Sequence, residues 1–316
     1  MNFRTSLPVK PVSSIIQLDY NANILMLGSC FAENIGSKLD YFRFENLMNP
    51  FGILFHPKAI ENLISKSINQ YEYTQEDIFF HNEQWHCFEA HSDLSAPSKE
   101  NLLEELNTNI QSTYNYLNNA THIVITLGTA WTYRYISSDN FVANCHKIPQ
   151  KKFLKELLSV EDIVSSLESL NTLIKSVNPK VNIIYTVSPV RHLKDGVTEN
   201  SLSKAHLLSA VHQVVEPRNS LYYFSAYEIM MDDLRDYRFY KSDMIHPNQT
   251  AIDYIWEKFK SVWISDSADN LMNEIDTIQK GLTHKPFNEN SEQHQQFLKN
   301  LRLKIKGLQE SRNINF

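Results

Sequence analysis

Glycine is scarce in this sequence. Only seven of the 316 residues are glycine, whereas an average protein contains about 7%. Each glycine at the end of an apolar run is therefore more informative than usual. Gly28 is one of them, because it ends a short apolar run within the stretch ILMLGSCFAENIG at residues 24–36.

Cysteine and positive charge are also in short supply. The three cysteines, Cys30, Cys87 and Cys145, are odd in number and far apart, so we expect no disulfide framework and a reducing compartment. The formal net charge is −6, so the chain lacks the excess of positive charge that is typical of proteins that bind nucleic acid. We expect no nucleic-acid partner.

Long apolar runs are missing as well. A membrane-spanning helix needs about 20 apolar residues, and no run in the sequence approaches that length. Cys30 follows Leu27-Gly28-Ser29, which invites comparison with a lipid attachment site. A secretory signal needs a basic start and an apolar stretch of roughly 7–15 residues, whereas polar residues and prolines interrupt everything before Ile24. The sequence therefore predicts a cytoplasmic protein without a lipid anchor or a membrane partner.

Short apolar runs alternate with amphipathic stretches along the chain. The runs lie at residues 24–27, 123–127, 181–187 and 221–224, and the helical patterns at about 31–39, 99–117, 160–177, 203–215 and 250–263. Near-continuous apolar strands alternating with helices are typical of a parallel sheet covered on both faces. We predict an α/β fold, an open parallel sheet flanked by helices in a three-layer sandwich.

Two segments fall outside this pattern. Residues 50–100 are rich in aromatic residues and histidine and are predicted to be an insertion near the active site, within a first domain at 1–265. Residues 266–316 are predicted to form a helical extension. Its final basic helix carries one apolar stripe, made of Phe297, Leu298, Leu301, Ile305 and Leu308. We expect this stripe to pack on the body or on a second subunit of a homo-oligomer rather than on a membrane.

Two short patterns could carry chemistry. Ser29 follows a predicted strand, at the sheet edge where ligands bind in such folds; it could be a nucleophile or only the N-cap of the next helix. Asp243 stands three residues before His246, so its carboxylate can reach one ring nitrogen and leave the other free to take a proton from a serine. A surface pair or a pair of metal ligands would explain this D-x-x-H pattern equally well. Cys30 is a weaker candidate nucleophile, since nothing in the sequence argues for a lowered pKa.

Other candidates have simpler explanations. His81, His86 and His91 recur every five residues, a spacing that lines neither a helical nor a strand face, so a metal site is not expected. Arg191, beside His192, follows a strand and would suit a carboxylate or phosphate on the substrate, although a structural ion pair is the alternative. Trp131 and Tyr133 could line a sugar or acyl pocket or simply pack.

Several motifs together resemble one known family. They are GSCFA at 28–32, NPFG at 49–52, GTAW at 128–131, NCHK at 144–147 and DMIHPN at 243–248. This order resembles the GSCFA family, which is grouped with the SGNH (GDSL-like) hydrolases, and it covers nearly the whole chain. The resemblance implies that Ser29 is the nucleophile, His246 the general base and Asp243 its orienting carboxylate.

The resemblance also implies an oxyanion hole. SGNH enzymes build it from the backbone N–H of the nucleophile, a glycine N–H and an asparagine side chain, and Gly52 matches the glycine. The superfamily pattern G-x-N-D would fall on residues 128–131, where Ala130 cannot donate a hydrogen bond. Asn144 or Thr129 could take over, or Asn144 could be an ordinary loop residue. Losing one such donor costs roughly 2.7–4 kcal/mol of barrier.

The prediction is a serine esterase or acyl esterase that acts on a small-molecule or carbohydrate ester through an acyl-enzyme, without metal or other cofactor. An acyltransferase with the same triad is the first alternative. A carbohydrate-binding or interaction protein on a decayed hydrolase scaffold is the second, and Ala130 is its best argument. A metal-dependent phosphoesterase that uses Asp243 and His246 as ligands is the third.

Overall fold

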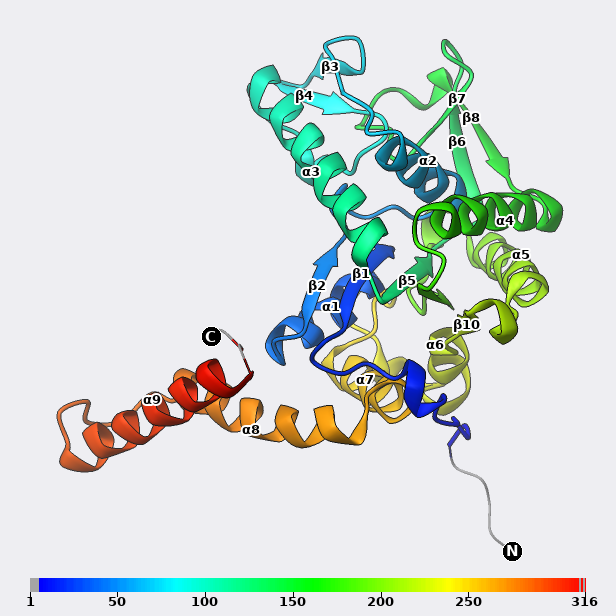
Figure 1. Ribbon diagram of the computed structural model, residues 1–316. Coiled ribbons are helices and arrows are strands. Elements are labelled where there is room, and N and C mark those ends of the chain that lie inside the picture. The colour runs from blue at the N-terminus through cyan, green and yellow to red at the C-terminus, as the bar shows by residue number, and fades with distance from the viewer. Residues whose placement is uncertain (1–5, 313, 315) are drawn as a thin grey trace, which may run out of the picture.

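A five-stranded parallel sheet forms the centre of the protein. The computed structural model (Figure 1) describes residues 6–312, 314 and 316. The strands of the sheet run in the order β10-β9-β5-β1-β2. Their bounds are Asn23–Gly28 for β1, Glu45–Met48 for β2, His122–Leu127 for β5, Asn182–Val187 for β9 and Leu221–Tyr223 for β10. Because all five are parallel, their carboxyl ends meet at one edge of the sheet, where open α/β sheets bind ligands. The predicted sheet is confirmed.

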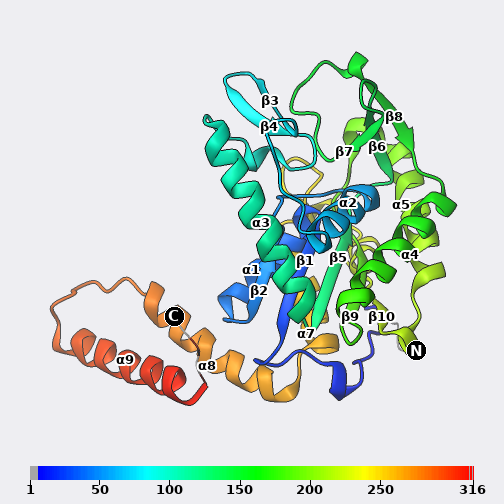
Figure 2. The ribbon, with the colours of Figure 1, turned by 45° about the horizontal axis from the view of Figure 1, so that its top comes forward.

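Helices cover both faces of this sheet, as Figure 2 shows. One face carries α2 (Pro57–Ile68), α3 (Lys99–Asn119), α4 (Val160–Val177) and α5 (Val197–Val214); the other carries α1 (Cys30–Tyr41), α6 (Ala226–Glu228) and α7 (Gln249–Trp263). Successive side chains of a strand point to opposite faces, so Leu25 and Leu27 pack in the first layer, and Ile24 and Met26 in the second. Burial on both sides explains why the strands read as continuous apolar runs.

The segment predicted as an insertion contributes partly to this core. Helix α2 has Pro57 in its first turn and His56 as its N-cap, with Ala59 N–H donating to His56 Nδ1. Ile60, Leu63 and Ile64, at helical spacing, are buried against the sheet. The prediction placed all of residues 50–100 outside the core, whereas helix α2 within this range covers one face of the central sheet.

Two small antiparallel sheets lie beyond the carboxyl edge (Figure 1). The hairpin β3 (Ile78–His81) and β4 (Gln84–Cys87) belongs to the predicted insertion. The second sheet, with the order β7-β6-β8, was not predicted; its strands are β6 (Trp131–Tyr135), β7 (Asn140–Val142) and β8 (Phe153–Leu157). Three residues separate the end of β5 from the start of β6, so this second sheet stands beside the carboxyl edge.

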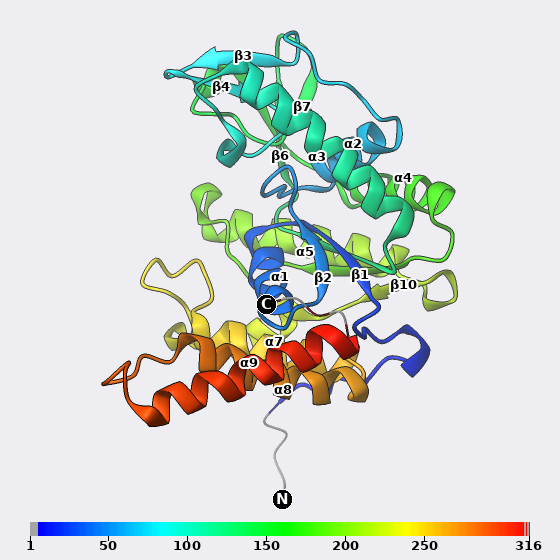
Figure 3. The same ribbon diagram turned by 60° about the vertical axis from the view of Figure 1, so that its left-hand side comes forward.

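The C-terminal part is a pair of helices, α8 (Asp266–Thr283) and α9 (Glu292–Arg312), which Figure 3 shows lying side by side. Leu301 and Leu308 of the predicted stripe pack on Ile275 and Ile278 of α8, and Gly281 leaves room for Leu301. The domain boundary at residue 265 and the oligomer stay predictions. No helix in the described part of the chain is long and apolar enough to cross a bilayer.

Candidate active site

The turn from β1 into α1 depends on Gly28. Its φ is +127°, and a Cβ there would lie 2.0 Å from the carbonyl oxygen of Thr126 on the neighbouring β5. Only glycine fits such a position. The next residue, Ser29, donates its backbone N–H to the same oxygen over 3.0 Å, so β1 ends pressed against β5.

Ser29 occupies the N-cap of α1. Its Oγ accepts the N–H of Phe31 at 3.3 Å, and the residue is 0% exposed. The cap considered in the sequence analysis is therefore present. Within the described residues, no hydrogen bond joins Ser29 Oγ to His246.

Cys30 is not set up as a nucleophile. Burial raises the pKa of its thiol to about 11, and Glu33 raises it further, against the opposing effect of Lys204 and Lys241. A reactive cysteine needs a lowered pKa, because the thiolate is the nucleophile. All three cysteines are free thiols.

Asp243 and His246 form a preorganised pair in the loop before α7. Asp243 Oδ2 lies 2.7 Å from His246 Nδ1, and Asp243 Oδ1 accepts the N–H groups of Ile245 at 2.8 Å and of His246 at 3.0 Å. These bonds, first the backbone N–H of His246 and then its ring, hold the pKa of the Asp243 carboxyl well below its usual range. The contact expected from the D-x-x-H spacing is present, and it leaves Nε2 of a ring that is 41% exposed available for proton transfer.

Arg191 connects this loop to the end of β9. Its backbone N–H donates to Ile245 O at 3.2 Å. Its guanidinium stacks 4.2 Å from the ring centroid of Tyr240 and 5.1 Å from that of Tyr237. The structural alternative considered for Arg191 was an ion pair; the structure instead holds the guanidinium by cation–π contacts.

A buried lysine lies between the ends of β5 and β9. Lys204 comes from α5, and its Nζ donates to Gly128 O and Ser188 O, each at 2.7 Å. Burial lowers the pKa of this amine to about 7. The preceding residue, Ser203, accepts the N–H of Ala130 at 2.7 Å. Sequence reasoning missed Lys204, because a lysine on a helix normally indicates a solvated face.

His192 occupies the same edge. Its ring packs edge-on against Phe55 with centroids 5.1 Å apart, and the backbone N–H of His192 donates to Asn200 Oδ1 at 2.8 Å. Burial lowers the pKa of the ring to about 3, and the nearby Lys204 and His246 lower it further. The imidazole is therefore neutral at ordinary pH.

The predicted oxyanion-hole donors already have partners. Gly52 donates its N–H to Asn49 O at 2.7 Å, and its missing side chain makes room for His91, whose Cβ a Gly52 Cβ would meet at 2.5 Å. Asn49 in turn accepts the N–H of Gly28 through Oδ1 at 2.9 Å. In this arrangement, Gly52 and Asn49 support the turn at Gly28.

Thr129 and Asn144 are similarly engaged. Thr129 Oγ1 lies 3.0 Å from Ser203 Oγ and accepts the N–H of Trp131 at 3.0 Å. Asn144 Oδ1 accepts the N–H of His146 at 2.8 Å, and Asn144 Nδ2 lies 3.5 Å from Ser92 Oγ. Both side chains line a cavity, and in the described part of the chain neither forms a hydrogen bond with Ser29.

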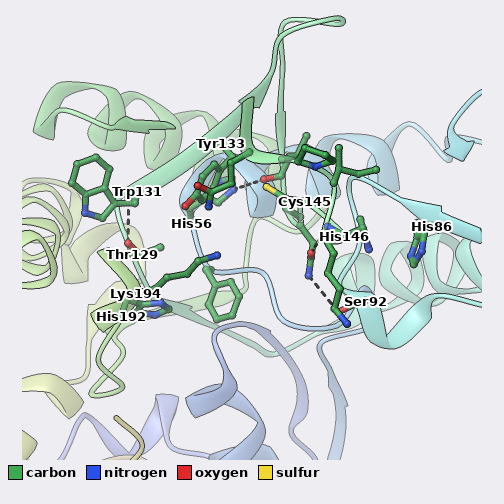
Figure 4. Close-up of a pocket in the computed structure, with 18 of the residues that line it drawn as sticks. His56, His86, Ser92, Thr129, Trp131, Tyr133, Cys145, His146, His192 and Lys194 are labelled. Atoms are coloured by element: carbon green, nitrogen blue, oxygen red, sulfur yellow. Dashed lines mark hydrogen bonds between the residues drawn. The ribbon is translucent and has the colours of Figure 1, made fainter. Parts of the chain in front are cut away.

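That cavity lies between the sheet edge and the two small sheets and has a volume of about 830 Å³. Figure 4 shows Thr129, Trp131 and His192 at one side, and Ser92, His86 and His146 at the other. Ser29, Asp243 and His246 are not among its lining residues. A second cavity of about 650 Å³ includes Arg191 and Lys204.

The histidines of the predicted insertion do not gather around an ion. His86 is buried, with Nδ1 2.6 Å from Ser95 Oγ and Nε2 2.9 Å from His81 O. His91 caps the short turn at 92–94. In the described ranges, no group of three or more His, Cys, Asp or Glu residues is arranged to hold a metal ion.

Fold and site together define an α/β protein with a serine at the end of β1 and an Asp–His pair before the last helix of the sheet. A sequence profile of the GSCFA family matches residues 23–259, and one described as GSCFA domain protein, C-terminal domain, matches residues 275–316. The chain belongs to the GSCFA family.

Solved structures share only a distant likeness. A carbohydrate esterase family 3 protein from Talaromyces cellulolyticus has 9% identity and a TM-score of 0.37, covering 81% of this chain and 99% of its own. An acetyl esterase mutant with acetate ion has 8% identity and a TM-score of 0.36 over the same shares. No curated protein matches the sequence.

Proposed function

We propose that the protein is a serine esterase of the SGNH kind, with Ser29 as nucleophile, His246 as general base and Asp243 as the carboxylate that orients the base. The observation that supports it most is the 2.7 Å contact between Asp243 Oδ2 and His246 Nδ1. A carboxylate there fixes the tautomer with the proton on Nδ1, stabilises the imidazolium that forms later, and leaves Nε2 as a base.

The reaction follows from these roles. Ser29 Oγ leaves the Phe31 N–H and attacks the ester carbonyl carbon while its proton moves to His246 Nε2, and the carbonyl π electrons move onto oxygen. When this intermediate collapses, an electron pair of the oxyanion re-forms the carbonyl, and the bond to the leaving alkoxy oxygen breaks. That oxygen takes the proton from His246 and departs as the alcohol, which leaves an acyl-enzyme. Water then repeats the two steps and releases the acid.

Thr129 and His192 line the larger cavity at the carboxyl edge of the sheet, so the carbohydrate or other small polar part of an ester would occupy this cavity while its carbonyl extends toward Ser29. Trp131 and Tyr133 supply aromatic faces, and Gln84, Asn144 and Lys194 supply hydrogen-bonding groups around a volume of about 830 Å³. Ligand pockets of about 300–1,000 Å³ combine apolar walls with a few polar groups in this way.

The test is hydrolysis of acetyl to octanoyl esters by the wild type, Ser29→Ala and the matched control Cys30→Ala. We expect hydrolysis to disappear in Ser29→Ala and to persist in Cys30→Ala. Activity that survives Ser29→Ala would reject the proposed nucleophile. Adding a sugar acceptor and identifying the acylated product separates an acyltransferase from an esterase.

A further inference from the structure

An oxyanion needs hydrogen-bond donors, and the backbone donors predicted from the sequence already form hydrogen bonds with carbonyl oxygens of the protein. The N–H of Ser29 donates to Thr126 O and that of Gly52 to Asn49 O. Ala130, where the superfamily has an asparagine, has no donor in its side chain. Since the transition state of ester cleavage places negative charge on oxygen, a further donor at the end of β5 is needed.

His192 has an unused nitrogen at this place. Among the described residues, only a few buried side-chain nitrogen and oxygen atoms have no hydrogen-bond partner, and His192 Nε2 is one of them. Buried polar groups in proteins are nearly always paired, and an exception calls for an explanation. A ligand that supplies the missing partner explains it.

The position of this nitrogen fits the reaction. A Cβ on Gly128 would lie 3.1 Å from His192 Nε2, so the ring approaches the backbone directly beyond β5. Gly28 and Thr126 are register partners on β1 and β5, and neighbouring strands lie about 4.8 Å apart. Nε2 therefore lies beside Gly128, two residues past the register partner of Gly28, at the same edge of the sheet as Ser29.

Neighbouring groups keep the ring fixed and uncharged. Phe55 packs edge-on against the ring, and Asn200 Oδ1 accepts the backbone N–H of His192 and so holds the main chain from which the ring extends. Burial first, and then the nearby Lys204 and His246, lower the pKa of the ring, so an imidazolium is disfavoured. A neutral imidazole carries one proton, and as the Nε2–H tautomer it donates toward the site without competing with His246 for the proton of Ser29.

We propose that His192 Nε2–H donates a hydrogen bond to the oxyanion formed at the ester carbonyl, in the role that Ala130 cannot fill. The inference rests on the proposed esterase function. It makes His192 a catalytic residue that acts on the transition state more than on the bound ester, so its loss should lower kcat and leave KM almost unchanged.

The experiment compares His192→Gln, which keeps an N–H donor, with His192→Leu, which has similar bulk and no donor. We expect kcat to fall roughly 100- to 1,000-fold in His192→Leu, with KM within about threefold of the wild type, and less than about tenfold in His192→Gln. Affinity for a boronic acid that mimics the tetrahedral intermediate should fall in parallel with kcat. His212→Gln, an exposed histidine on α5, is the matched control and should not change either quantity.

Thermal melting establishes that each variant is folded, and His192→Ala replaces His192→Leu if the latter does not fold. Equal losses in the Gln and Leu variants, or an unchanged kcat in the folded variant without a donor, would overturn the role of His192. In both cases wild-type hydrolysis would still support the esterase proposal. A wild type without hydrolysis of any ester overturns both.

Discussion

Lys204 provides a test of the electrostatics at the sheet edge. Its amine is buried against Gly128 O and Ser188 O, and burial lowers its pKa from 10.5 to about 7. An unfolded chain gives lysine a pKa of about 10.4. Between about pH 7 and 10, unfolding therefore takes up a proton, and the free energy of unfolding rises with pH. This contribution is lost as the pH falls through the folded pKa.

The size of this change in the free energy of unfolding follows from the uptake of one proton. Its uptake changes the free energy of unfolding by about 1.36 kcal/mol per pH unit, which gives about 2 kcal/mol between pH 8 and 9.5. Lys204→Met removes this titration. It also leaves two carbonyls without a donor, a cost of about 1–3 kcal/mol each that does not depend on pH. Of the neighbours, Cys30 has its pKa raised to about 11 and His192 lowered to about 3, so neither changes charge in the folded state within this interval.

Denaturant unfolding of the wild type and Lys204→Met at both pH values measures the effect. We expect the difference in free energy of unfolding between the two proteins to grow by about 2 kcal/mol in favour of the wild type as the pH rises from 8 to 9.5. Lys180→Met, at an exposed lysine, should show no such change. A difference for Lys204→Met that stays constant to within about 0.5 kcal/mol would refute the reasoning.

Three further predictions concern the strand end, the triad and the cavity. Gly28→Ala should lower the free energy of unfolding by about 2–5 kcal/mol, because residue 28 has a positive φ and the new Cβ would collide with Thr126 O. Gly307→Ala, whose Cβ meets nothing within 4 Å, is the control, and equal free energies of unfolding for the two variants would contradict this prediction. Asp243→Asn should keep the fold by circular dichroism and lower kcat about 10⁴-fold; a change below tenfold would remove Asp243 from the triad. Trp131→Ala should raise KM for a sugar ester at least about tenfold with little change for a small aryl acetate, and equal effects on both would exclude a sugar contact.

Much of the fold was predictable, because burial on both faces makes the strands of a parallel sheet apolar throughout. The exceptions have physical reasons. Strand β2 is an edge strand with partly exposed side chains and no apolar run, and β6 alternates aromatic and polar residues outside the core. Helix α5 begins at Val197, six residues before the predicted start at 203, because its first turns bury Asn200 and Ser203 rather than apolar residues.

In the candidate site too, contacts between neighbours in the sequence were predictable and contacts between distant residues were not. The Asp243–His246 contact is local, so a spacing of three residues was enough to predict it. The positions of Lys204 and His192 depend on contacts with Gly128, Ser188 and Phe55, which are far away in the sequence. No local pattern indicates that these two polar side chains are buried at the end of β5.

The central claim is that Ser29 is the nucleophile, and covalent labelling tests it most directly. The wild type is treated with a fluorophosphonate, digested, and the modified peptide identified by mass spectrometry. We predict one adduct, on Ser29, which disappears in Ser29→Ala and persists in Cys30→Ala. Undiminished labelling of Ser29→Ala, or an adduct on another residue, would contradict it.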